Sequence, residues 1–135
     1  METDAKFLND FQTGILPFEQ WTHAAHIRMA YLVCHSSNNF EEALEKIRQG
    51  IQHFNGLHAS KLKIGFHETM TQFWTRLIWN ATQKCPSSIA DSKAFIDQHG
   101  YLMDSSLWKQ YYSPTLMFSS EAKSGFIPPD LKPIS

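Results

Sequence analysis

Three histidines are the residues of this chain whose types and spacing could do chemistry. His23 and His26 lie three residues apart in the apolar stretch WTHAAHIRMAYLVC (21–34), and His67 lies in FHETMT (66–71). On a helix, two residues at this spacing lie about 60° apart, so both imidazoles share one face. Their ring nitrogens can then approach one point, as a pair of metal ligands requires.

The neighbours of these histidines indicate that all three face inward. Ile27 and Cys34 fall on the same helical stripe as His23, whereas Arg28 projects away from it. On a helix through His67, Trp74 falls within about 20° of that residue. An imidazole in such a place loses water contacts and needs polar partners.

The residues after His67 suggest how it would be assisted. Thr71 follows at i+4, where a hydroxyl can reach an imidazole, so we expect it to orient the ring. Glu68 lies on the flank of the stripe. It is either a first-turn carboxylate that interacts with the helix dipole or a residue of the site.

Three hypotheses follow. The leading one is a small metal-dependent enzyme that acts on a small organic molecule: His23, His26 and His67 bind one transition metal ion (Zn, Fe, Cu or Ni), with Glu68 as general base or fourth ligand. The second is a metal-free acid–base enzyme, an isomerase or cyclase, in which His67 and Glu68 move protons. The third is a non-catalytic protein whose histidines bind a small molecule by hydrogen bonds.

Other polar residues offer weaker candidates. His35, His58 and His99 lie at helix ends or in a loop, where caps and surface positions are common, and His53 falls on a polar helix face. The metalloprotease motif H-E-x-x-H is absent because residue 71 is Thr. The chain also lacks a nucleophile motif and a glycine-rich phosphate loop.

Composition excludes several classes of protein. The chain has 135 residues, with 12 Lys and Arg against 13 Asp and Glu, and no basic cluster, so we expect no nucleic-acid partner. No apolar run is long enough to cross a bilayer, and the acidic N-terminus lacks a signal-peptide pattern. These features predict a cytoplasmic protein. Cys34 and Cys85 suggest no disulfide framework, and Cys34 is expected in the core.

The sequence pattern predicts that all the elements that position these residues are helices. Apolar spacing and capping residues predict helices over 3–14, from residue 21 or 22 to the turn formers HSSNN (35–39), over 40–54, from about 66 to 82 and over 86–100, with Ser87 or Ser88 capping the last. A short helix is expected within 104–112, and one turn at 119–125. The prediction is therefore an all-α bundle of about five helices, forming a single domain over 1–135.

The C-terminal region from about residue 113 is expected to form an extended tail. Three prolines in FIPPDLKPIS (126–135) forbid a helix there and reduce the entropy lost when the segment docks. We expect the tail to pack over the bundle and help to close the pocket. Asp130 is the one tail charge that could reach a polar site, and the alternative is that it is exposed to solvent.

Three motifs together resemble a known family. WTHAAH (21–26), FHETMT (66–71) and PPDLKPI (128–134), in this order, are similar to motifs of a family of short, uncharacterised helical proteins that are mostly bacterial. The resemblance spans most of the chain and implies no particular activity, cofactor or substrate. It implies that one group of residues acts together: Trp21, His23, His26, His67, Glu68, Thr71 and Asp130. Trp74 joins this binding group by its place on the His67 face.

Overall fold

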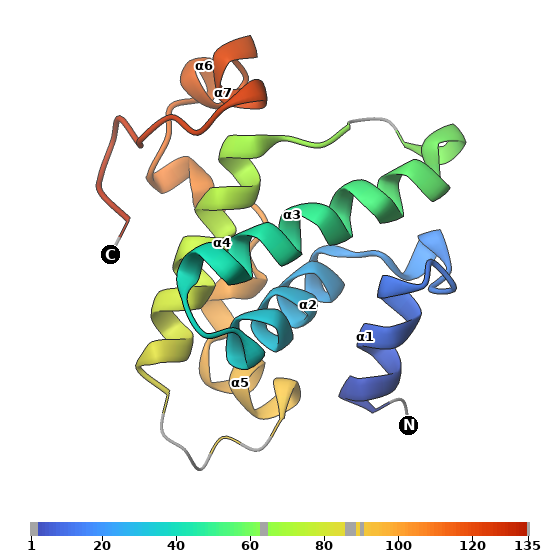
Figure 1. Cartoon of the computed structure of the whole chain (residues 1–135). Coiled ribbons are helices and arrows are strands. Elements are labelled where there is room, and N and C mark those ends of the chain that lie inside the picture. The colour runs from blue at the N-terminus through green and yellow to red at the C-terminus, as the bar shows by residue number, and fades with distance from the viewer. Residues whose placement is uncertain (1–2, 63–64, 86–88, 90, 135) are drawn as a thin grey trace.

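The computed structural model describes residues 3–62, 65–85, 89 and 91–134, and these residues form seven α-helices and no strand (Figure 1). The all-α class predicted from the sequence is confirmed. The helices are α1 (Asp4–Gln12), α2 (His23–Ser36), α3 (Phe40–Leu57), α4 (Glu68–Gln83), α5 (Ser92–Gln98), α6 (Pro114–Met117) and α7 (Ser120–Ser124). Short 3-10 turns lie at Phe18–Gln20, Ala59–Lys61, Gly100–Met103 and Leu107–Gln110.

Local sequence sets where the first three helices begin. The hydroxyl groups of Thr3 and Thr22 accept hydrogen bonds from backbone N–H groups in the first turns of α1 and α2, at 3.1 and 3.2 Å. The side chain of Asn39 does the same for α3 at 2.8 Å. Each side chain satisfies a donor that would otherwise lack a partner inside its helix.

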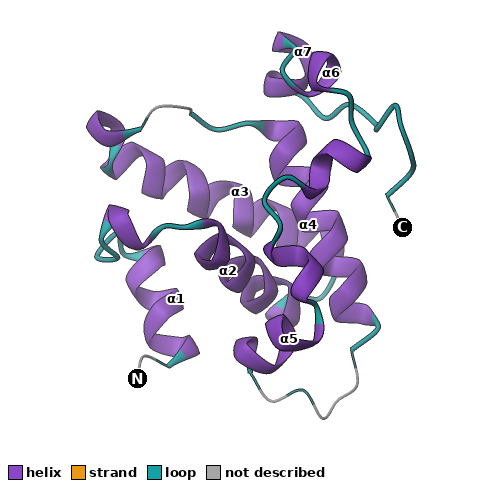
Figure 2. Cartoon of the chain, turned by 180° about the vertical axis from the view of Figure 1, so that it is seen from behind, coloured by secondary structure: helices purple, strands orange, loops and turns teal. Residues whose placement is uncertain are grey.

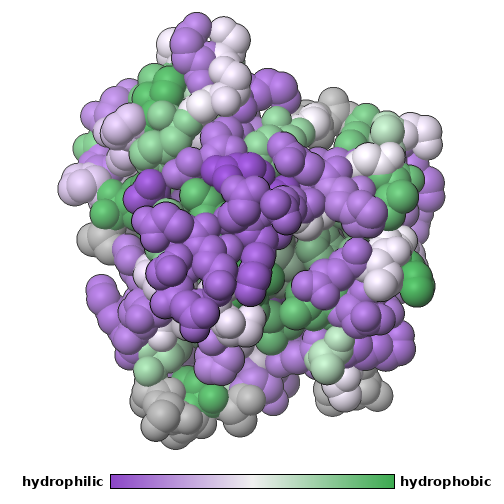
Figure 3. Space-filling model, in the orientation of Figure 1, coloured by the Kyte–Doolittle hydropathy of each residue, from purple (hydrophilic) through white to green (hydrophobic). Residues whose placement is uncertain are grey.

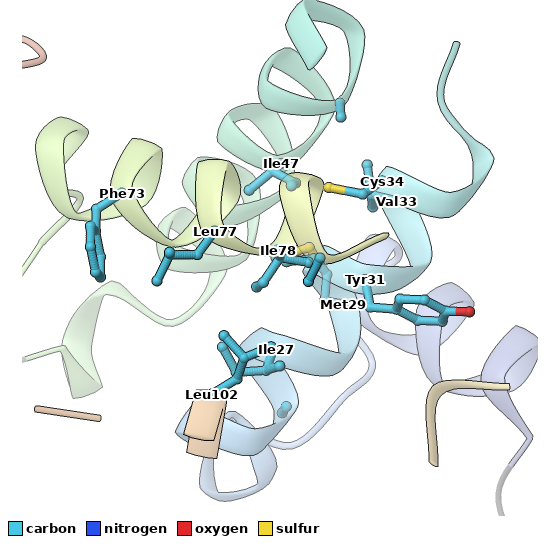
Figure 4. Packing of buried hydrophobic residues seen from close by; sticks show 14 of the residues in the cluster. Ile27, Met29, Tyr31, Val33, Cys34, Ile47, Phe73, Leu77, Ile78 and Leu102 are labelled. Atoms are coloured by element: carbon cyan, nitrogen blue, oxygen red, sulfur yellow. The ribbon is translucent and has the colours of Figure 1, made fainter. Parts of the chain in front are cut away.

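Helix α2 is the centre of the bundle, and it packs most extensively against α4 and also against α3 and α5. Because neighbours cover several sides of α2, its buried residues are not confined to one stripe. Figure 4 shows the core between these helices; it contains Ile27, Met29, Tyr31, Val33 and Cys34 from α2, Ile47 from α3, Phe73, Leu77 and Ile78 from α4, and Leu102. Cys34 is 1% exposed, as expected for a core residue.

Two ion pairs among the described residues join consecutive α-helices. The Arg28 Nε donates to Asp4 Oδ1 at 3.0 Å, and Asp4 also accepts a hydrogen bond from the backbone N–H of Ser92, which ties α1 to α2 and α5. The guanidinium of Arg48 on α3 donates two hydrogen bonds to Glu68 at the start of α4, at 2.9 and 2.6 Å. The second pair joins α3 to the first turn of α4, next to His67.

Two predicted helix starts were wrong. The fourth helix begins at Glu68, and the extended backbone of His67 makes that residue the N-cap of α4 instead of a residue of its buried stripe. The fifth helix begins at Ser92 and is capped by Asp91, whose side chain accepts from the Ala94 N–H at 2.9 Å. Ser87 and Ser88, the predicted caps, lie outside the described residues.

The C-terminal region is less uniform than predicted, because α6 and α7 precede the extended segment. Figures 1 and 2 show these two short helices beside the N-terminal end of α4, away from α5. The tail is held by hydrogen bonds to the bundle: the backbone N–H of Ile127 donates to Thr69 Oγ1 at 3.1 Å, and Tyr112 Oη donates to the Ile127 carbonyl at 2.6 Å.

The outer surface in the view of Figure 3 is mainly hydrophilic, with hydrophobic side chains visible in a hollow between polar ones. In the described part of the chain, no helix is long and apolar enough to cross a membrane.

Candidate functional site

A cavity of about 520 Å³ lies between α2, α3 and α4, and all three predicted histidines line it. We call it the histidine cavity. Its walls are mostly apolar and aromatic: Phe18, Trp21, Ile27, Ile47, Ile51, Phe66, Met70, Trp74, Ile78, Trp108 and Phe118. Asn55, Thr71, Thr75 and Ser105 add polar groups, and none of the described lining residues is Asp, Glu, Lys or Arg. The cavity therefore suits an uncharged molecule with a large apolar part.

His23 is the first residue of α2, and its ring is held in one orientation. Its Nε2 lies 2.8 Å from the carbonyl oxygen of Leu102. Because a carbonyl only accepts, Nε2 must carry a proton, and Nδ1 remains as an acceptor in the neutral ring. The edge of the indole of Trp74 packs against the ring, with 4.8 Å between centroids.

His26 is one turn further along α2 and has the opposite tautomer. Its Nδ1 lies 2.8 Å from the carbonyl oxygen of Thr22, so the proton is on Nδ1 and Nε2 is bare in the neutral ring. The imidazole packs on Trp21, with 3.7 Å between ring centroids. Burial lowers the pKa of His26 from 6.5 to about 4, although the Thr22 hydrogen bond opposes this shift. His26 is therefore neutral at physiological pH.

His67 also lines the cavity, but both of its ring nitrogens have backbone partners. Nδ1 accepts from the Met70 N–H at 3.0 Å, which caps α4. Nε2 donates to the carbonyl oxygen of Met117 at 2.8 Å, which joins the start of α4 to α6. The two bonds fix the tautomer and give His67 a structural role that the helical-face argument did not predict.

Glu68 does not line the histidine cavity. Its carboxylate is buried, receives both hydrogen bonds from Arg48 and also accepts one from the side chain of Gln72. The hydrogen bond from Arg48 keeps the pKa of Glu68 below its ordinary value despite the opposing effect of burial. The structure thus places this carboxylate in an ion pair between α3 and α4, where it is a weak base.

The remaining predicted residues divide between two cavities. Trp21, Thr71 and Trp74 line the histidine cavity. The hydroxyl of Thr71 does not orient His67 as predicted, because both nitrogens of that ring are already bonded to the backbone. In the described residues, no three His, Cys, Asp or Glu side chains are grouped so that they could hold a metal ion.

Asp130 lies apart from the histidines, in a second cavity of about 690 Å³. We call it the tail cavity; Phe40, Arg76, Trp79 and Asn80 line it together with most of the tail over 126–134. Asp130 accepts a hydrogen bond from the backbone N–H of Ser113 at 2.8 Å, and its bonds with Ser113 lower the pKa of its carboxyl group. The tail therefore lines this second cavity, and none of its described residues over 126–134 lines the histidine cavity.

Sequence reasoning missed several groups that shape the histidine cavity. The carbonyl groups of Leu102 and Met117 orient two of the three imidazoles, and Asn55 and Ser105 add polar side chains to the wall. These carbonyls come from segments 79 and 50 residues away from their histidines. No local pattern signals such contacts, because any residue type supplies a carbonyl oxygen.

No family model, curated protein or solved structure matches the chain. The geometry of the two cavities is therefore the basis for proposing what the protein binds.

Proposed function

We propose that the protein binds a small, uncharged and largely apolar molecule in the histidine cavity, and that Nε2 of His26 accepts a hydrogen bond from it. One observation carries the proposal: the Nδ1–H of His26 is taken by the Thr22 carbonyl, which leaves Nε2 as a bare acceptor on a ring that lines an aromatic cavity. The preferred ligand has a donor, such as a hydroxyl or an N–H group.

The walls support an apolar body for this ligand. Trp21, Trp74 and Trp108 supply aromatic surface, and such surface binds flat apolar groups well. A charged ligand would lose its hydration without meeting an opposite charge among the described lining residues, which is unfavourable. A cavity of about 520 Å³ is within the usual range for sites that enclose small organic molecules.

The pKa of His26 favours an acceptor over a catalytic base. A general base works best when its pKa lies near the pH of the reaction, and about 4 is far below neutral. The acid–base hypothesis built on His67 and Glu68 has less support, because His67 uses both nitrogens for backbone bonds and Glu68 is paired with Arg48.

A matched pair of ligands tests the proposal. 1-Naphthol has a hydroxyl donor, and 1-methoxynaphthalene has the same ring system without the donor. One neutral hydrogen bond contributes about 0.5–1.5 kcal/mol, so we expect the naphthol to bind roughly 2- to 13-fold more tightly. In a His26→Phe variant the ring packing on Trp21 is kept, the acceptor is lost, and the two ligands should bind equally.

The control variant is His53→Phe, since His53 is exposed on α3. It should keep the preference for naphthol. The proposal is wrong if neither ligand binds the native protein at its solubility limit, or if the preference for naphthol survives in His26→Phe.

A metal-dependent enzyme acting on a small organic molecule is the second candidate, and a specific feature supports it. His23 and His26 each donate one ring N–H to a backbone carbonyl, which is how metal-binding imidazoles are commonly oriented. Nδ1 of His23 and Nε2 of His26 would be the ligand atoms, while His67 would have to give up a backbone bond to join them. Since His26 stays neutral down to about pH 4, protons compete little for its Nε2.

Elemental analysis of protein purified without a histidine tag separates this candidate from the first. After incubation with Zn, Fe, Cu or Ni, His23→Ala and His26→Ala should lose metal, and His35→Ala should keep it. His67→Ala distinguishes a site with three histidines from a site with two. Less than about 0.1 metal ion per native chain under all four conditions excludes this candidate.

A further inference from the structure

The tail cavity contains an arginine whose environment differs from that of the other two arginines in the chain. Arg28 pairs with Asp4, and Arg48 pairs with Glu45 and Glu68. Arg76, on α4, forms no ion pair with any Asp or Glu of the described residues; its one hydrogen bond there joins Nη2 to the side-chain oxygen of Gln72 at 3.1 Å. A partly buried cation without a carboxylate partner is unusual, because burial removes part of its hydration.

The aromatic neighbours of Arg76 compensate for this only in part. Its guanidinium lies over the rings of Phe40 and Phe126, with 4.8 and 4.6 Å to the ring centroids. These cation–π contacts stabilise the charge. They leave the Nε–H of Arg76 buried without a hydrogen-bond partner among the described residues. The two rings thus hold the planar guanidinium in place, and Gln72 is its one hydrogen-bond partner among the described residues.

We propose that the tail cavity binds a small monocarboxylate with an apolar body, and that the guanidinium of Arg76 binds its carboxylate group. An arginine held by aromatic rings suits a planar carboxylate, to which it can donate more than one hydrogen bond. Trp79, Leu131 and Ile134 would contact the apolar body, and Asn80 adds a polar group to the same wall.

The charges around the cavity favour a single negative charge on the ligand. Lys132 also lines it, with Nζ 4.7 Å from the ring centroid of Tyr111. Asp130 lines it too, and its carboxylate is held by the N–H of Ser113. Two cations and one anion leave a net charge of about +1, which matches a carboxylate better than a phosphate dianion.

This site is independent of the proposed function, since none of the described residues lines both cavities. Both cavities flank α4 and use different faces of it: Thr71, Trp74 and Ile78 face the histidine cavity, and Arg76, Trp79 and Asn80 face the tail cavity. Binding in one cavity can therefore be measured without a ligand in the other.

The experiment is an NMR titration with phenylacetate, observed through the Nε–H resonances of the three arginines. We expect the Arg76 signal to move downfield and saturate, while the signals of Arg28 and Arg48 stay in place. Phenylacetamide, which has the same shape and no charge, is the ligand control and should leave all three signals unchanged. Arg76→Lys identifies the Arg76 signal and keeps the charge, but it should weaken binding at least about tenfold because it lacks the planar fork.

Two further variants complete the design. Lys132→Met should weaken binding about two- to threefold, because it removes an exposed charge near the site. Lys93→Met, on the distant helix α5, should leave binding unchanged. If Arg76→Lys fails to fold, Arg28→Lys and Arg48→Lys identify the other two signals, and the native titration decides. The proposal is overturned if about 20 mM phenylacetate leaves the Arg76 signal in place, or if phenylacetamide moves it equally.

Discussion

Replacing His67 tests whether the ring has the structural role that its two backbone bonds indicate. His67→Ala removes the N-cap of α4 and the link from Nε2 to the Met117 carbonyl. Losing an N-cap side chain costs about 1 kcal/mol. Losing one further neutral hydrogen bond costs about 1 kcal/mol. The free energy of unfolding should therefore fall by roughly 2 kcal/mol.

His67→Asn separates the two contributions. Asparagine is among the best N-cap residues, so it can still accept from the Met70 N–H, but it is too short to keep the bond to Met117. We expect this variant to lose about 1 kcal/mol, half the loss in His67→Ala. Asparagine lacks an imidazole, so the stability that it restores comes from capping alone.

The assay is urea unfolding followed by far-ultraviolet circular dichroism, with a chelator present so that no bound metal adds to stability. The slope of the transition must be the same in all three proteins for the midpoints to be compared. The reasoning is refuted if His67→Ala lies within about 0.5 kcal/mol of the native protein. It is also refuted if His67→Asn is as unstable as His67→Ala, because the capping argument would then fail.

Three other predictions concern stability and order. Ile47→Ala should lower the free energy of unfolding by roughly 2–5 kcal/mol, because Ile47 is 2% exposed. Ile51→Ala should lower it by less, since Ile51 is half-buried, and His53→Ala, at an exposed position, by less than about 0.5 kcal/mol. Urea melts of the three variants would show this ranking. For His26, both folded and unfolded states are neutral above pH 6.5, and between 6.5 and about 4 only the unfolded state gains a proton. The free energy of unfolding should therefore decrease by at most roughly 3 kcal/mol as the pH is lowered from 6.5 to about 4. Melts of His26→Phe over the same pH range should lack this decrease. Asp130→Asn weakens the bond to the Ser113 N–H, and hydrogen exchange should report faster opening at Ser113 while the amides of α2 keep their protection.

The helices were largely predictable from the sequence because their signals are local. Helix α3 has apolar residues at helical spacing and an asparagine cap, and it begins at the predicted residue. Helix α2 lies in its predicted range because Thr22 caps it and its stretch is apolar. The observed starts of α4 and α5 differ from the predicted ones because His67 and Asp91 are the capping residues. Because histidine is not an expected N-cap, the sequence pattern predicts a fourth helix that starts before His67, whereas His67 caps α4 in the structure.

The sequence predicted part of the lining of the histidine cavity, but it did not predict the contacts of these residues, and Glu68 and Asp130 lie elsewhere. The sequence placed His23, His26 and Trp74 on inward faces, and the structure places all three around one cavity. The sequence could not show that Arg48, 20 residues earlier, forms an ion pair with the carboxylate of Glu68. Several oppositely charged residues of the chain could pair with a given acid, and only the fold selects one of them. The same limit applies to Arg76: the pattern places an arginine on α4 and does not say whether an acid faces it.

The two cavities differ in how their polar groups are satisfied, and this difference decides what each can bind. Around the histidine cavity, His23 and His26 each donate their ring N–H to a backbone carbonyl, which leaves one neutral acceptor on each ring, whereas both ring nitrogens of His67 are bonded to the backbone. In the tail cavity, the guanidinium of Arg76 has no carboxylate partner, and its Nε–H no acceptor, among the described residues. Acceptors without charge select ligands that donate, and a cation with free donors selects anions. Since the described residues that line one cavity do not line the other, the affinity for naphthol should be the same with and without phenylacetate. A change of more than about threefold, matched by an equal change for phenylacetate in the presence of naphthol, would contradict this independence.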